Sequence, residues 1–240
     1  MEHNESQVVS SKQPCDDCGS SDAKAYYDDG HTYCYSCQTH HRGNTMNTEV
    51  TLMPRGTEVE LENMKQRWMN AKPASIPDRS LKSGTVAHYG VLVTDTKHYY
   101  PYFKDGESVP CGFKIRTVDN KGFAVLGDIK GTGLFGQQKF GNARRKTVIV
   151  TEGEVDAMAA YQMLEGKFHV VSIRGGAAHA GQNFKEAYDY LDGYEEIVLC
   201  FDADDAGKAG IEKAAEVFAG KLKVIKLDPR LGKDAADYLT

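Results

Sequence analysis

Two groups of acidic residues follow apolar runs in the C-terminal part of this 240-residue chain. The run 148–150 leads through Thr151 into the first group, and the run 197–201 leads into the second. The acidic residues are Glu152, Glu154, Asp156, Asp202, Asp204 and Asp205. If the runs are parallel strands, their carboxyl ends meet at one edge of a sheet, where ligands bind. Carboxylates crowded there repel one another unless a cation joins them, and Mg²⁺ prefers such oxygen ligands. The structural alternative is that Asp204 or Asp205 caps the helix predicted to begin near Ala206.

Four cysteines near the N-terminus form a second candidate site. Cys15, Cys18, Cys34 and Cys37 follow the pattern C-x2-C-x15-C-x2-C. Two such pairs in a chain without a secretory signal indicate a closed, structural Zn²⁺ site rather than a redox pair or an iron–sulfur cluster. The residues between the pairs are expected to form a hairpin, and this small module should unfold without metal.

The residues between the two cysteine pairs are rich in aromatic and polar side chains. They include Tyr26, Tyr27, Asp28, Asp29, His31, Tyr33 and Tyr35. These aromatic rings could build the small core of the module, or they could form a surface that stacks on single-stranded bases. Spacing alone leaves both alternatives open. The other two cysteines, Cys111 and Cys200, lie in apolar runs and are expected to be buried thiols.

The elements that must position the carboxylates are strands alternating with helices from residue 146 onward. The predicted strands are Thr147–Val150, His169–Ile173, Glu196–Asp202 and Lys223–Leu227. The predicted helices cover 154–165, 183–192 and 205–219. This alternation predicts an α/β domain with a parallel sheet and right-handed crossovers.

The whole chain is expected to be a multi-domain α/β protein. A small four-cysteine zinc-ribbon β module, a linker and an α+β basic subdomain precede the parallel-sheet domain. The expected boundaries are a disordered tail 1–12, the zinc module 13–43, the linker 44–60, the basic subdomain 61–145 and the α/β domain 146–240. The subdomain should contain a short helix in "MKQRWMNA" and strands in "HYYPYF" and "CGFKIRTV" around the turn "KDGES".

The net charge of −5 is unevenly distributed. Residues 60–145 carry 14 basic against 8 acidic side chains, whereas the segments on either side are acidic. Within the basic segment, Lys114, Arg116 and Lys121 could neutralise triphosphate oxygens, or they could simply form the solvent-exposed face of a strand. We find no apolar run long enough to span a membrane and no signal peptide, so a cytoplasmic protein without a membrane partner is expected.

Together these motifs resemble a known family. A strand running into E-G-x-x-D and a later strand running into D-x-D resemble the Toprim domain. The segments "CDDCGSSDAKAYYDDGHTYCYSC", "VTEGEVDAM" and "FDADDAGKAG" look most like the primase half of the primase–helicases of short-tailed bacteriophages, which is a DnaG-type DNA primase. The resemblance implies Mg²⁺-dependent synthesis of short RNA primers from ribonucleoside triphosphates on a single-stranded DNA template. It also implies a hexameric helicase domain, in cis or in trans, and a replicative DNA polymerase as partners, in the cytoplasm of the host cell.

The resemblance also assigns roles to individual residues. Glu152 takes the position of the Toprim glutamate, a general base or metal-proximal group, and Asp202 and Asp204 take the Mg²⁺ positions with Asp156 in support. The other matched positions are Lys114 and Lys121 at the incoming nucleotide, Asp29 and His31 at the template, and Asp234, in "KDAADYL", near the metals. Two departures stand out: Ala236 replaces the family's asparagine, and Arg174 precedes the glycines of "IRGGAAHAG".

Three hypotheses remain: a primase, a non-enzymatic recombination mediator, and a topoisomerase or Toprim nuclease. The chain has no Walker loop, since "GFAVLGD" has an aspartate where that motif needs lysine; it is expected to be a fragment or a free-standing primase. A non-catalytic recombination mediator also combines a four-cysteine zinc site with Toprim, but it begins with a helix–hairpin–helix segment and does not need the full acidic set. A topoisomerase needs a further large domain, and a Toprim nuclease has no evident need for a template-reading module.

Overall fold

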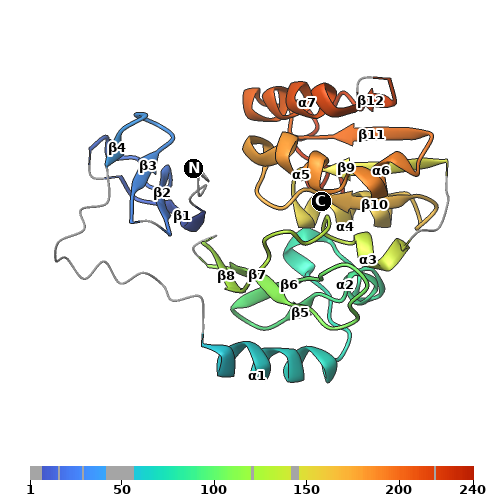
Figure 1. Ribbon diagram of the computed structural model, residues 1–240, viewed down its shortest axis with the longest axis horizontal. Helices are drawn as coiled ribbons and strands as arrows, with labels where there is room; N and C mark the ends of the chain where they lie inside the picture. Colours follow the sequence, from blue (N-terminus) through green and yellow to red (C-terminus); the bar gives the residue numbers. More distant parts are fainter. Residues whose placement is uncertain are drawn as a thin grey trace. The chain divides into compact units, whose positions relative to one another are not determined.

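The computed structural model describes most of the chain (Figure 1). The described residues are 7–15, 17–28, 30–41, 57–119, 122–141, 146–218 and 220–240. They fall into two compact units, and the boundaries of these units do not coincide with those of the five expected segments. Unit 1 comprises Met1–Asn70, Thr94–Tyr99 and Cys111–Ile129, and unit 2 comprises Ala71–Val93, Tyr100–Pro110 and Lys130–Thr240.

The N-terminal part of unit 1 is a small antiparallel β module. Its strands are β1 (Val8–Gln13), β2 (Lys24–Tyr27), β3 (Thr32–Cys34) and β4 (His40–His41). Strands β2 and β3 form the hairpin that the cysteine spacing predicts. The expected disorder of residues 1–12 is wrong from Val8 onward. There the backbone pairs with β2 in an irregular register, which satisfies polar groups that a free tail would leave to water.

Unit 1 also contains a helix and a basic hairpin. Helix α1 (Glu58–Met69) begins with a capping box, because Thr57 Oγ1 accepts the Glu60 N–H at 3.2 Å and Glu60 Oε2 accepts the Thr57 N–H at 2.6 Å. The helix therefore begins inside the expected linker, most of which lies outside the described residues. The expected strands are present as β6 (Lys97–Tyr102) and β7 (Gly112–Thr117).

Strand β7 pairs antiparallel with β8 (Phe123–Gly127), which the sequence did not predict. Strand β8 also touches β1 at the single pair Ser11↔Phe123, so the strands that lie wholly in unit 1 run in the order β4-β3-β2-β1-β8-β7. The β7–β8 hairpin thereby displays the basic residues of β7 beside an aromatic residue of β8.

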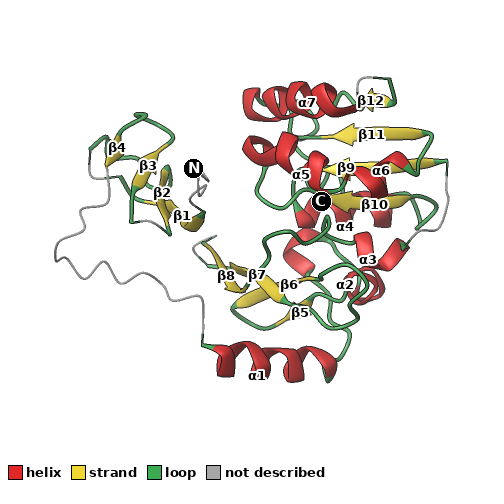
Figure 2. Cartoon of the chain, in the orientation of Figure 1, coloured by secondary structure: helices red, strands yellow, loops and turns green. Residues whose placement is uncertain are grey.

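The C-terminal part of unit 2 is the predicted α/β domain (Figure 2). Its strands are β9 (Thr147–Thr151), β10 (His169–Ser172), β11 (Glu196–Cys200) and β12 (Leu222–Val224). They are all parallel, in the order β10-β9-β11-β12. Strand β12 is shorter than predicted, because the Ile225 N–H to Leu199 carbonyl bond of 2.8 Å is the last that β11 offers before it ends.

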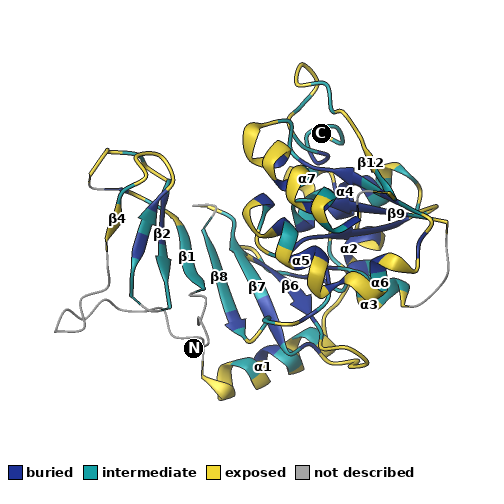
Figure 3. Ribbon diagram, turned by 45° about the horizontal axis from the view of Figure 1, so that its top comes forward, coloured by how far each residue is buried: buried dark blue, intermediate teal, exposed yellow. Residues whose placement is uncertain are grey.

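Helices cover both faces of this sheet. They are α4 (Glu154–Met163), α5 (Ala180–Glu186), α6 (Tyr188–Asp192) and α7 (Asp205–Phe218). The helix predicted over 183–192 is thus two, divided at Ala187. Val148, Val150 and Leu199 are buried in one cluster with side chains of α5, α6 and α7. Helix α4 contacts β9 and β10, and its Ala157 and Met158 are fully buried; Figure 3 shows the strands of this sheet largely in the buried colour. Within the described residues, no helix has the length and apolar character needed to cross a bilayer.

Segments that precede the α/β domain in sequence pack onto it within unit 2. They contain η1 (Pro77–Arg79), α2 (Ser83–Tyr89), β5 (Leu92–Val93) and α3 (Gln137–Phe140). Gln162 of α4 holds the turn before α2: its Oε1 accepts the Lys82 N–H at 2.8 Å, and its Nε2 donates to the Ser80 carbonyl at 2.9 Å. Tyr89 Oη donates to the Val170 carbonyl at 2.7 Å. These contacts explain why the basic segment is not a compact body of its own.

Candidate metal centres

The four cysteines of the β module meet at one point. All four sulfurs lie within 4.8 Å of one another, and the pairs Cys15–Cys37 and Cys18–Cys34 are each 3.8 Å apart. A tetrahedral zinc with Zn–S bonds of about 2.3 Å separates its sulfurs by roughly 3.8 Å, whereas a disulfide requires about 2.05 Å. The cluster therefore fits a four-thiolate zinc site and no disulfide.

Polar neighbours surround the sulfurs. Thr39 Oγ1 lies 3.1 Å from Cys37 Sγ, and this hydroxyl lowers the pKa of Cys37 to about 6. Asp17 Oδ2 lies 2.7 Å from His41 Nε2 and 3.7 Å from Cys15 Sγ. Such outer partners orient metal ligands and favour the thiolate that binds zinc.

The aromatic residues of the module are half-buried, apart from the exposed Tyr35. Cys15, Ala25 and Cys34 are its buried apolar residues among those described, whereas Tyr35 is 55% exposed. His31 stacks on Tyr27 with ring centroids 3.9 Å apart and planes 15° apart. Half-buried rings both pack within the module and present part of their faces to solvent, so the core and contact-surface alternatives both stay open. Asp29, the other predicted template residue, lies outside the described residues.

Glu152 and Asp202 come together at the carboxyl edge of the parallel sheet. Strands β9 and β11 are neighbours, with Thr151 paired to Cys200, so the residues that follow them leave the sheet side by side. Burial raises the pKa of Glu152, and the charge of Asp202 raises it further. Burial likewise raises the pKa of Asp202, while Lys233, with its Nζ 3.3 Å from Asp202 Oδ2, acts in the opposite direction. The predicted convergence of these carboxylates is therefore present.

One oxygen of Glu152 is held and the other is not. Glu152 Oε1 accepts the Ala177 N–H at 3.2 Å, whereas Oε2 is buried and has no hydrogen bond of ordinary geometry among the described residues; the nearby Asp202 backbone N–H only lowers the pKa of Glu152 slightly against the effect of burial. A buried carboxylate oxygen without a partner carries a desolvation cost that a bound cation would remove. This oxygen and the donor set around it fit Mg²⁺.

Asp156 and Asp234 form a second acidic pair beside the first. Asp156 Oδ1 accepts the Ala236 N–H at 3.1 Å, and Asp234 Oδ1 accepts the Asp237 N–H at 2.8 Å. Burial raises the pKa of Asp156 well above its usual range, and the charges of Asp234 and Asp202 add to that shift. Since Ala236 acts through its backbone, the missing asparagine side chain does not remove this bond.

The capping alternative is correct for one oxygen of Asp204. Its Oδ1 accepts the Gly207 N–H at 2.9 Å in the first turn of α7, while Asp205 pairs with Lys208 at the surface. Among the described residues, only the cysteines gather three or more possible ligands closely enough to enclose an ion. The carboxylates stand wider apart. This spacing suits Mg²⁺, which commonly binds one or two carboxylates and completes its shell with water and phosphate.

The predicted nucleotide residues lie in the other unit. Lys114 and Arg116 share one face of β7 by strand alternation, and Lys114 Nζ lies 4.9 Å from the centroid of the Phe123 ring. Lys121 lies outside the described residues. Sequence reasoning missed Lys233 and Ala177, both of which contact the carboxylates. The glycines before Ala177 were a signal for a tight turn, but a backbone donor has no signature of its own.

Fold and sites together define a protein that joins a four-cysteine zinc module to a Toprim domain. Residues 149–239 match the Toprim-like family. The sequence is 30% identical over 235 residues, 95% of this chain, to the DNA helicase/primase of Enterobacteria phage T3.

Solved structures agree with this match. The primase fragment of the bacteriophage T7 primase–helicase protein has a TM-score of 0.64 at 29% identity, over 97% of this chain and 94% of that one. A chain from the structure of T7 lagging-strand DNA polymerase with primase domains, an RNA/DNA hybrid and dTTP has a TM-score of 0.62 at 31% identity, over 70% and 85%. The Aquifex aeolicus primase, at 14% identity and a TM-score of 0.55, shares the fold.

This chain belongs to the bacteriophage primase–helicase family and corresponds to its DnaG-type primase half. It spans 41% of the length of the phage T3 relative.

Proposed function

We propose that this chain is a DNA primase that makes short RNA primers on single-stranded DNA by Mg²⁺-dependent nucleotidyl transfer. The observation that carries the proposal is the buried, unpartnered Glu152 Oε2 beside Asp202 at the carboxyl edge of the sheet. Residues 61–145 and 146–240 would together form the polymerase domain, with residues 13–43 as the template-reading module.

The carboxylates have distinct tasks in this proposal. Asp202 and Asp204 would hold Mg²⁺ through the oxygens that do not bind Lys233 and Gly207, and Asp156 and Asp234 would support them. Glu152 would accept the proton of the attacking 3′-hydroxyl. When bound, Mg²⁺ activates that hydroxyl and stabilises the charge that develops at the α-phosphate and on the leaving pyrophosphate. Lys114, Arg116 and Lys121 neutralise triphosphate oxygens of the incoming ribonucleotide.

The zinc module reads the template in this proposal. The stacked pair Tyr27–His31 and the exposed Tyr35 offer ring faces and hydrogen-bonding groups to unstacked bases. Asp29 and His31 are the proposed reading residues. Zinc holds the two knuckles that carry this surface.

The proposed partners follow from the relatives. The phage T3 protein is named a helicase as well as a primase, and the T7 structure pairs primase domains with a DNA polymerase and an RNA/DNA hybrid. We therefore expect a hexameric helicase domain, in cis or in trans, and a replicative DNA polymerase to act with this chain in the host cytoplasm.

A matched pair of aspartates tests the proposal. Asp202, whose side chain is 17% exposed, and Asp205, 99% exposed, follow the same strand. With Mg²⁺, ribonucleotides and varied single-stranded templates, Asp202→Asn should lower template-dependent primer synthesis about 1,000-fold, and Asp205→Asn less than about threefold. Equal effects of the two substitutions would contradict the assigned metal site. If no template yields product while DNA binding is intact, the chain is a binding module of the recombination-mediator kind.

A further inference from the structure

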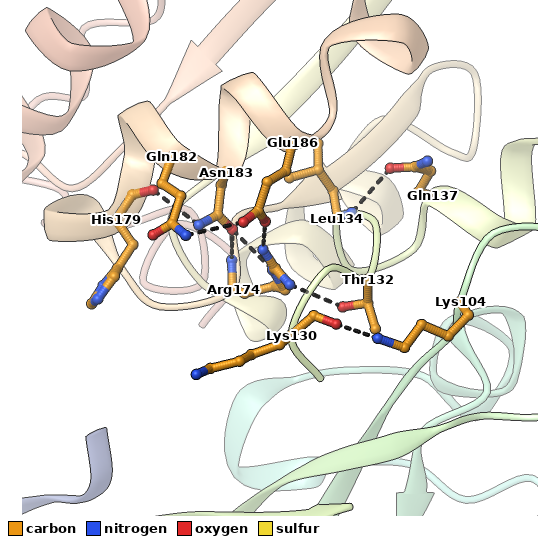
Figure 4. A network of polar contacts seen from close by, with 10 residues as sticks. All are labelled: Lys104, Lys130, Thr132, Leu134, Gln137, Arg174, His179, Gln182, Asn183 and Glu186. Atoms are coloured by element: carbon orange, nitrogen blue, oxygen red, sulfur yellow. Dashed lines mark hydrogen bonds and ion pairs between the residues drawn. The ribbon is translucent and has the colours of Figure 1, made fainter. Parts of the chain in front are cut away.

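Arg174, which precedes the glycines of the loop after β10, is the centre of a buried polar network (Figure 4). Its side chain is 11% exposed and forms an ion pair with Glu186 of α5. Its Nε donates to Asn183 Oδ1 at 3.3 Å, and its Nη1 donates to Thr132 Oγ1 at 3.3 Å. Asn183 and Thr132 are 4% and 3% exposed. A forked guanidinium is suited to joining three acceptors at once.

Asn183 clamps both ends of the loop that follows Arg174. Its Oδ1 accepts the Arg174 N–H at 2.8 Å, and its Nδ2 donates to the His179 carbonyl at 2.9 Å. Between these two points lie Gly175, Gly176 and the short helix η2 (Ala177–His179). Gly176 has φ +75° and stands close to Glu152, where a Cβ would come within 3.6 Å of Glu152 Oε1. Two adjacent glycines would leave this segment loosely determined without the clamp.

The clamped loop supplies the hydrogen bond to Glu152. The first residue of η2, Ala177, donates its N–H to Glu152 Oε1. The position of that donor depends on the loop, and the loop is held by Asn183, to which the Arg174 side chain also binds. Glu186 is itself fixed by Gln182, whose Nε2 donates to Glu186 Oε1 at 3.0 Å. The network thus reaches from α5 to the carboxylate at the sheet edge.

We infer that Arg174 is a positioning residue for Glu152. It holds η2 so that Ala177 engages Oε1 and leaves Oε2 to face the ion. The inference deepens the proposed function and rests on the metal site assigned there. The competing role is purely structural: Arg174 would only fasten the segment around Thr132 to α5. The two roles differ in which contacts matter, because Asn183 binds both Arg174 and His179 of η2, whereas Thr132 belongs to the segment that a purely structural Arg174 would fasten.

Manganese binding separates the two roles without relying on primer synthesis. The full chain, loaded with zinc, is titrated with Mn²⁺ while free Mn²⁺ is followed by electron paramagnetic resonance. Asp202→Asn defines the binding that belongs to the acidic site. Arg174→Gln should weaken that binding about tenfold, as loss of an outer partner typically does. Thr132→Val should leave it within about twofold.

Two outcomes would overturn the inference: Arg174→Gln binding Mn²⁺ as the wild type does, or Thr132→Val losing as much as Arg174→Gln. If Arg174→Gln does not fold, Glu186→Gln replaces it, with an expected loss of about threefold because only the charge partner is removed. In primer synthesis, Arg174→Gln should lower kcat with KM for nucleotides within about twofold. If the wild type makes no primers but Mn²⁺ binding is still weakened by Arg174→Gln and not by Thr132→Val, the polymerase proposal is wrong and the inference about Arg174 stands.

Discussion

The two candidate metal centres of this chain differ in how much buried core surrounds them. In the zinc module, four sulfurs stand at ligand separation, and the buried apolar residues beside them are few. In the Toprim domain, a continuous core of aliphatic and aromatic residues supports the sheet, and the carboxylates at its edge stand apart with raised pKa values. A zinc ion at the first site would take the place of a core, whereas an ion at the second would bind to a fold that already exists.

The largest expected effect comes from removing zinc. Structural zinc contributes about 10–16 kcal/mol to the folding of small modules, far more than the few buried residues here can supply. Cys34→Ser, or zinc chelation, should therefore unfold the segment 8–41. Hydrogen exchange measured by mass spectrometry should show this segment at the unfolded rate, with β9–β11 still protected. Template selection should be lost while Mn²⁺ binding at the acidic site persists; equal loss of both would contradict separate roles.

A smaller effect on stability is expected at the acidic site, where the ionised carboxylates lower the stability of the metal-free fold. The pKa values of Glu152, Asp156 and Asp202 are raised above the ordinary values of 4.5, 3.8 and 3.8. Such groups stabilise the fold below their unfolded pKa, and this stability is lost as the pH rises through the folded pKa. Without Mg²⁺, the zinc-loaded protein should therefore be less stable at pH 7.5 than at pH 5 through these three groups.

Asp156→Asn isolates that effect. Removing one buried charge should raise the melting temperature at pH 7.5 without Mg²⁺, by about 2–4 °C for each kcal/mol regained, and reduce its dependence on pH. The same variant should lose much of the stabilisation that Mg²⁺ gives the wild type. Asp205→Asn is the control: Lys208 lowers the pKa of that exposed carboxyl, so no gain is expected. A gain from Asp205→Asn equal to that from Asp156→Asn would show that net charge alone is responsible.

The sequence predicted what depends on spacing and strand order. The cysteine pattern implied the four-sulfur cluster, and two apolar runs ending in acid implied the meeting of Glu152 with Asp202. It did not predict which oxygen of each carboxylate is occupied, because backbone donors such as those of Ala177 and Ala236 depend on the tertiary fold. Strand β8 was missed for the same reason. Its pairing with β7 depends on the tertiary structure, and the apolar residues of "GFAVLGD" do not specify it.

The smallest expected effect tests how the Toprim domain is held without a metal. Gln162 makes three hydrogen bonds to the start of α2 and the turn before it: it accepts from the Lys82 N–H and from Thr85 Oγ1, the latter at 3.0 Å, and donates to the Ser80 carbonyl. Gln162→Ala leaves those groups without their partner and should lower the free energy of unfolding by about 1–3 kcal/mol. Urea denaturation followed by a probe in unit 2 measures this loss.

Gln66 provides the matched control for that experiment. Its side-chain amide bonds only Glu62, at 3.4 Å on the exposed face of α1, so Gln66→Ala should change stability by less than about 0.5 kcal/mol. If Gln162→Ala costs no more than Gln66→Ala, side-chain clamps do not hold the turn, and the packed core alone supports the sheet. A loss of stability confined to unit 2, with the cysteine module unaffected, is the result expected if many modest contacts stabilise unit 2 and a bound zinc ion would stabilise the cysteine module.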